Sequence, residues 1–162
     1  MNYHKIEKTS VANGLGVRVV LWCSGCRLYC KNCHNPETWN FNSGKQFDEE
    51  AKKELFESLN KPYIQGITFS GGHPLENENV NEVYHLCKEI KEKFPEKDIW
   101  LYTGYLFEDI ASYLVIKYID VLVDGRYIEE QKDITLKWRG SKNQRVIDVQ
   151  KSLKENKIVL YN

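Results

Sequence analysis

The sequence predicts an α/β fold whose mainly parallel sheet forms a partial (open) TIM-like barrel. Apolar, β-branched segments alternate along the chain with segments of helical periodicity, and no repeat or low-complexity linker interrupts them. Such alternation is typical of βα units with parallel strands and right-handed crossovers. The 162 residues fall short of the roughly 250 of an eight-unit barrel. We therefore expect one domain over residues 1–162, with about five or six βα units.

The predicted elements follow one another in a regular order. Residues 17–22 form a β-branched strand that leads into a cysteine-rich loop, and residues 64–70 form a second strand that ends at a glycine pair. Asp48 is placed to cap a helix over 48–59, and Pro95 ends a helix over 79–94. The remaining expectations are a strand at 99–102, a helix at 106–113, a strand at 119–123, a strand or helix start at 146–149 and an apolar tail at 158–161.

Composition restricts the class of partner. The 23 basic and 23 acidic side chains cancel, so no global positive field would attract nucleic acid or an anionic membrane. No apolar run approaches the ~20 residues of a membrane span. The first residues lack the apolar region of a signal peptide. We expect a cytoplasmic protein with no nucleic-acid or membrane partner.

The cysteines are the strongest chemical signal. Four of the five lie within residues 23–33, a crowding that indicates metal or redox chemistry rather than disulfides in a reducing compartment. Structural zinc would need two CxxC pairs about 15–20 residues apart, and here they nearly touch. A ferredoxin-like electron carrier would use a CxxCxxCxxxC run followed by proline, which this loop also lacks. Cys26, Cys30 and Cys33 form a third pattern, CxxxCxxC.

Three thiolates on a short loop can hold three corners of a 4Fe-4S cluster and leave the fourth iron open to a small molecule. CxxxCxxC after a first strand resembles the signature of the radical S-adenosylmethionine (SAM) enzymes. The resemblance implies that Cys26, Cys30 and Cys33 bind the cluster and that SAM binds the open iron. Cys23 is expected to be a small buried apolar residue.

Gly71 and Gly72 end the second strand, where glycines let the backbone approach a ligand closely. In radical SAM enzymes this turn contacts the SAM amino group and is usually followed by Glu or Asp, whereas His73 follows it here. The expected SAM contacts are Gly71, Gly72, His73, Asn32, His34 and Thr103. No side chain is assigned a catalytic role, because the chemistry belongs to the cofactors.

Several of these residues also have ordinary structural interpretations. His34 could fix its loop by a hydrogen bond, and Thr103 could start a helix turn. Asp124 could touch the SAM ribose or pair with Arg126. The segment at 138–144 could form a partner-docking surface or pack within the fold.

Five further segments resemble the anaerobic (class III) ribonucleoside-triphosphate reductase activating proteins; they are 13–18, 33–39, 98–105, 121–127 and 138–145. The resemblance implies reductive cleavage of SAM to a 5′-deoxyadenosyl radical, which takes hydrogen from a glycine of the reductase large subunit. It also implies reduced flavodoxin or a similar electron donor. The alternatives are an activating enzyme of another glycyl radical enzyme such as pyruvate formate-lyase, or a zinc-binding adaptor.

Overall fold

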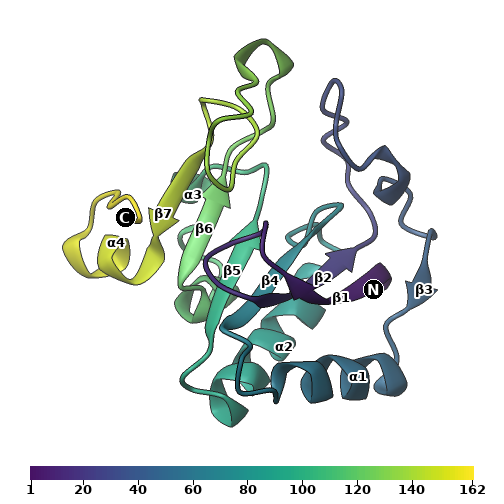
Figure 1. The fold of residues 1–162 in the computed structure, drawn as a ribbon. Coiled ribbons are helices and arrows are strands. Elements are labelled where there is room, and N and C mark those ends of the chain that lie inside the picture. Colours follow the sequence, from purple (N-terminus) through teal and green to yellow (C-terminus); the bar gives the residue numbers. More distant parts are fainter.

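The computed structural model describes residues 1–162 as one seven-stranded sheet with helices packed on one side (Figure 1). The strand order is β3-β1-β2-β4-β5-β6-β7. The strands are β1 (Asn2–Ser10), β2 (Arg18–Cys23), β3 (Lys45–Gln46), β4 (Gly66–Gly71), β5 (Asp98–Tyr102), β6 (Val121–Asp124) and β7 (Arg145–Asp148). The α-helices are α1 (Glu49–Leu59), α2 (Val80–Lys93), α3 (Phe107–Ile110) and α4 (Val149–Glu155).

The expected α/β class with a parallel centre is confirmed, and the sheet is mixed at its edges. β2, β4, β5 and β6 pair in parallel, whereas β1, β3 and β7 join antiparallel. Only these four strands are parallel to one another, so the structure has fewer parallel βα units than the five or six expected. The strand order is linear with β3 and β7 at its ends, and no pairing closes the sheet into a barrel.

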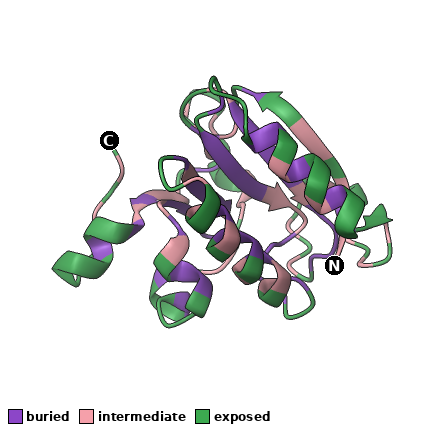
Figure 2. Ribbon diagram, turned by 90° about the horizontal axis from the view of Figure 1, so that it is seen from below, coloured by how far each residue is buried: buried purple, intermediate pink, exposed green.

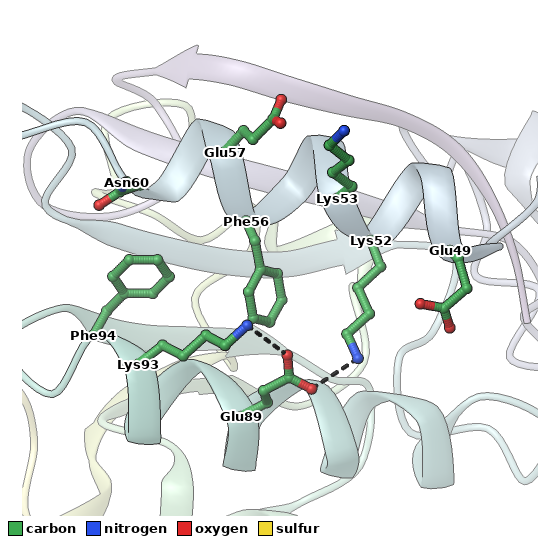
Figure 3. A pocket seen from close by; sticks show the side chains of 9 residues that line it. All are labelled: Glu49, Lys52, Lys53, Phe56, Glu57, Asn60, Glu89, Lys93 and Phe94. Atoms are coloured by element: carbon green, nitrogen blue, oxygen red, sulfur yellow. Dashed lines mark ion pairs between the residues drawn. The ribbon is translucent and has the colours of Figure 1, made fainter.

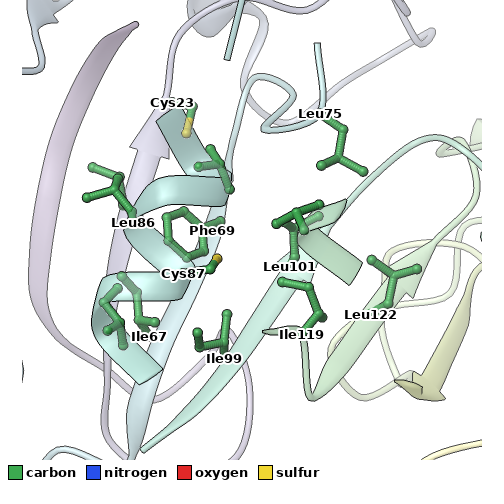
Figure 4. Packing of buried hydrophobic residues seen from close by; sticks show 14 of the residues in the cluster. Cys23, Ile67, Phe69, Leu75, Leu86, Cys87, Ile99, Leu101, Ile119 and Leu122 are labelled. Carbon is green, nitrogen blue, oxygen red and sulfur yellow. The ribbon is translucent and has the colours of Figure 1, made fainter. Parts of the chain in front are cut away.

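One face of the sheet packs against α1 and α2 and forms the main core (Figures 2 and 4). Alternate residues of the central strands point to this face, as strand geometry requires. Figure 4 shows Phe69, Leu101 and Cys87 of α2 meeting in this layer. Cys23 also lies there with no exposed surface, which confirms its expected role as a buried apolar residue. Asp48 caps α1 as predicted, because its side chain accepts a hydrogen bond from the Ala51 N–H.

The opposite face of the sheet carries a small aromatic cluster and a buried arginine. Trp100 is fully buried, and the Trp138 and Tyr161 rings pack edge-on against it. Arg18 has no exposed surface; its Nη2 lies 2.6 Å from Asp98 Oδ1, and its Nε donates to the Thr68 hydroxyl at 2.9 Å. A buried guanidinium is tolerated only when it is paired and hydrogen-bonded in this way. Trp138 and Tyr161, from the C-terminal part of the chain, thus help to cover the face that the helices leave open.

One predicted element differs from the structure, and one strand was missed. The helix expected at 106–113 is only the single turn of α3, followed by a 3-10 helix at Leu114–Tyr118. No strand was predicted at residues 2–10, because the lysine, glutamate and histidine side chains of β1 hide its alternation. No helix in the structure combines the length and apolar character that a membrane crossing needs.

A groove of about 500 Å³ runs between α1 and α2 (Figure 3). Glu89 of α2 pairs across it with Lys52 of α1 at 2.7 Å and along α2 with Lys93 at 3.3 Å, while Phe56 and Phe94 lie beneath. Charged side chains that pair over an apolar floor are typical of a solvated helix seam. None of the cysteines or glycines singled out in the sequence lines this groove.

Candidate functional site

A second cleft, of about 560 Å³, opens at the carboxyl ends of the parallel strands. This is the edge at which α/β sheets bind their ligands. Two long loops rise beside it, one after β2 and one after β6 (Figure 1). The cleft brings together most of the residues expected to bind the cofactors: Cys26, Cys30, Cys33, His34, Gly71, Gly72, His73 and Thr103 all line it.

The cysteine loop follows β2 directly and is folded by local hydrogen bonds. The Cys26 N–H donates to the Trp39 carbonyl at 3.0 Å, and the Cys33 N–H donates to the Cys30 carbonyl at 3.1 Å. Tyr29 and Asn32 adopt positive φ angles of 49° and 57°. Because these two non-glycine residues adopt left-handed backbone conformations, the chain turns tightly between the cysteines.

The donor set fits an iron–sulfur cluster, since soft thiolates are the ligands such clusters use. All three thiols reach the same cleft, Cys26 being buried and Cys30 and Cys33 half-buried. They are not gathered into a preformed metal-binding group, because no three cysteine, histidine or acidic side chains converge on one point. If these three cysteines hold the cluster, the loop over residues 26–33 would have to tighten around it.

Burial acts on the thiols of both Cys23 and Cys26. It raises the pKa of the Cys23 thiol to about 12, so this thiol stays protonated in the core. Burial also raises the pKa of Cys26, a hydrogen bond from the Leu28 backbone opposes this, and the charge of Glu76 adds to the rise. A metal ligand must be deprotonated, so cluster binding by Cys26 would release a proton.

The glycine turn is set against the cysteine loop by the register of the sheet. Gly71 pairs with Cys23 at the end of the β2–β4 ladder. The Gly72 N–H then donates to the Cys23 carbonyl and the His73 N–H to the Gly25 carbonyl, both at 2.8 Å. A Cβ at Gly72 would lie 2.6 Å from the Gly25 oxygen, so only glycine allows this approach.

His73 is 1% exposed, yet it lines the cleft. Its Nε2 lies 2.7 Å from the Thr103 hydroxyl, and its ring packs edge-on against Tyr105 at 4.4 Å. Its Nδ1 lies 3.4 Å from Glu76 Oε2 but is not aligned for a hydrogen bond. Burial lowers the pKa of His73 despite the opposing charge of Glu76, so the imidazole is neutral near pH 7.

The segment at 138–144 forms the wall of the cleft that faces the cysteines. Trp138 and Arg139 line the cleft, and the Trp138 carbonyl accepts a 2.6 Å hydrogen bond from the Tyr102 hydroxyl. Gln144 ties the segment to the turn after β6 by donating to the Gly125 carbonyl at 3.1 Å. Of the two interpretations of this segment, the structure favours packing within the fold, at the site itself.

Asp124 does not pair with Arg126. Its carboxylate is fully buried, binds Arg145 at 2.6 Å and accepts a hydrogen bond from the Phe107 N–H at 2.9 Å. Its role is to join β6, β7 and α3 below the cleft. Arg126 instead donates to the Leu28 carbonyl, which links the turn after β6 to the cysteine loop.

Asn32 is the one expected SAM contact that does not line the cleft; it lies exposed on the loop. His34 lines the cleft from an exposed position, with its ring 5.2 Å from that of Tyr127. The buried Glu76, which accepts a 2.7 Å hydrogen bond from the Arg27 N–H, was not predicted from the sequence. Its position three residues after His73 was the only available signal.

Comparison with known proteins agrees with this geometry. Residues 12–147 match the family model of a 4Fe-4S single cluster domain. The chain is 47% identical over 148 residues to the anaerobic ribonucleoside-triphosphate reductase-activating protein of Enterobacteria phage T4, covering 90% of this chain and 93% of that protein. The proteins of the same description from Vibrio cholerae and Escherichia coli K12 are each 41% identical, over 89% of this chain and 96% of theirs.

The fold and the cysteine-lined cleft therefore define an iron–sulfur protein with a 4Fe-4S cluster domain. More narrowly, the chain belongs to the family of anaerobic ribonucleoside-triphosphate reductase-activating proteins. This confirms the resemblance drawn from the sequence and disfavours the zinc and ferredoxin alternatives.

Proposed function

We propose that the protein is a radical SAM activase that installs a glycyl radical in an anaerobic ribonucleotide reductase. Cys26, Cys30 and Cys33 would hold the 4Fe-4S cluster. When bound, the cluster would supply the electron that cleaves SAM into methionine and a 5′-deoxyadenosyl radical. That radical would remove a hydrogen atom from a glycine of the reductase large subunit and leave 5′-deoxyadenosine.

The observation that carries this proposal is the single cleft that joins the three cysteines to the glycine turn. A ligand on the open iron would lie within reach of Gly71, Gly72, His73 and Thr103, which line the same cleft. His34 would contribute from the loop, and Asn32 would need the loop to tighten before it could contact SAM. The open, partly parallel sheet would act as the truncated barrel that supports this site.

The residues around the cleft have a positioning role in this scheme. The neutral His73 imidazole carries no positive charge that would repel the SAM ammonium. Tyr102 and Trp138 would help exclude water from the radical, a task that falls to the protein in cofactor chemistry. The reductase glycine would enter through the open side, and a reduced flavodoxin or similar carrier in the cytoplasm would supply the electron.

Anaerobic reconstitution followed by an assay for 5′-deoxyadenosine tests the proposal. We expect about four irons per chain and 5′-deoxyadenosine formation only when SAM and a reductant are both present. A colourless protein with one zinc would support an adaptor instead. A cluster that accepts electrons but leaves SAM intact would support an electron carrier.

A further inference from the structure

Glu76 is a buried carboxylate to which the cofactor scheme gives no role. It is 4% exposed and lies on the turn between the glycine pair and α2. Burial of a charge is costly unless partners compensate for it. Its partners should therefore explain why the chain keeps a carboxylate at this position.

Those partners lie on the cysteine loop. Glu76 Oε2 accepts the Arg27 N–H at 2.7 Å, one residue beyond Cys26, and Oε1 lies 3.3 Å from Arg27 Nη1. Asn79, on the same turn, donates from its side chain to the Ser24 carbonyl at 2.9 Å and to the His73 carbonyl at 3.0 Å. The turn is thus hydrogen-bonded to the start of the loop on both sides of Cys26.

Glu76 also faces the glycine turn. Its Oε2 lies 3.4 Å from Nδ1 of His73, a ring nitrogen with no hydrogen-bond partner. A proton on Nδ1 would face the carboxylate and leave Nε2 to accept from the Thr103 hydroxyl, 2.7 Å away. One carboxylate therefore reaches both the cysteine loop and the imidazole in the cleft.

We propose that Glu76 is a positioning residue that anchors the cysteine loop to the glycine turn and lowers the reduction potential of the cluster by its buried negative charge. The inference rests on the proposed ligation by Cys26, Cys30 and Cys33. A negative charge in a low-dielectric environment disfavours addition of an electron nearby. Net charge and hydrogen bonding around a cluster are known determinants of its potential.

The chain supplies a matched control in Glu78. This residue also pairs with Arg27, but only through the guanidinium, and its side chain is 43% exposed. An exposed pair is screened by solvent and contributes little. Glu76→Gln and Glu78→Gln each remove one negative charge from a residue that binds Arg27. The charge removed is buried in the first variant and exposed in the second.

The first measurement is hydrogen exchange at the Arg27 amide in the cluster-free protein. Loss of the charge-assisted hydrogen bond should accelerate exchange about fivefold in Glu76→Gln. Glu78→Gln should exchange at the wild-type rate. This measurement tests the anchor even if the protein should fail to bind a cluster, so it is independent of the proposed function.

The second measurement is the cluster midpoint potential after reconstitution. We expect a positive shift in Glu76→Gln and none in Glu78→Gln. Glu76→Asp, which keeps the charge but shortens the reach, should retain the wild-type potential while Arg27 exchanges faster. A wild-type potential in Glu76→Gln, or equal shifts in Glu76→Gln and Glu78→Gln, would overturn the inference. A wild-type protein that holds no cluster would instead contradict the proposed function.

Discussion

Replacing Cys26 by alanine should abolish cluster binding and SAM cleavage together. Cys26 is one of only three cysteines that line the cleft, and no other cysteine can take its place, because Cys23 and Cys87 are buried in the core. With two thiolates the cluster loses a corner ligand. We expect iron per chain to fall close to zero and 5′-deoxyadenosine formation to fall at least about a hundredfold, which corresponds to about 2.7 kcal/mol.

Cys23→Ala is the matched control for this loss. Cys23 lies only three residues before Cys26, but its side chain packs against the helix layer and does not line the cleft (Figure 4). Removing its sulfur should cost about 1 kcal/mol of stability and leave the iron content unchanged. Retention of SAM cleavage in Cys26→Ala, or loss of iron in Cys23→Ala, would show that the ligand set is wrong.

Replacing Gly71 by alanine should destabilise the whole domain. Gly71 has a φ of +104°, and an added Cβ would lie 2.5 Å from the Cys23 nitrogen and 2.6 Å from its oxygen. These are backbone atoms of the neighbouring strand, so no side-chain rotation relieves the clash. Strain from the positive φ and from overpacking together should cost about 3–5 kcal/mol. Urea unfolding of the cluster-free protein should show a correspondingly lower midpoint.

Gly140→Ala serves as the control, since Gly140 also lines the cleft. Its nearest neighbours are ring atoms of the Tyr127 side chain, at 3.0 and 3.1 Å, which can move. The stability change should stay within about 1 kcal/mol. Equal urea midpoints for the two alanine variants would contradict the close approach of Gly71 to the Cys23 backbone.

The parallel centre of the sheet was predictable because its strands are buried on both faces and read as apolar runs. Val19, Val20 and Leu21 on β2 are an example: consecutive side chains point to opposite faces, and all three are fully buried. The edge strands were not predictable in the same way. β1 is partly exposed and carries polar side chains, and β7 pairs antiparallel through a register that only the folded sheet defines.

The site was predictable where its residues form motifs of neighbouring positions in the sequence. The cysteine triad, the glycine pair and Thr103 all follow strands and converge on one cleft. Glu76 and Tyr102 could not be found by spacing, because their partners Arg27 and Trp138 lie 49 and 36 residues away. Asp124 was misjudged for the same reason: its partner is Arg145, 21 residues on, rather than Arg126 beside it.

The most direct test of the proposed function is electron paramagnetic resonance of an anaerobic ribonucleotide reductase large subunit mixed with this protein. With reconstituted cluster, SAM and a reductant, a glycyl radical signal should appear on the reductase. The signal should be absent when SAM is omitted or when the Cys26→Ala variant is used. A signal that forms with Cys26→Ala, or 5′-deoxyadenosine released with no radical on the reductase, would contradict the proposed function.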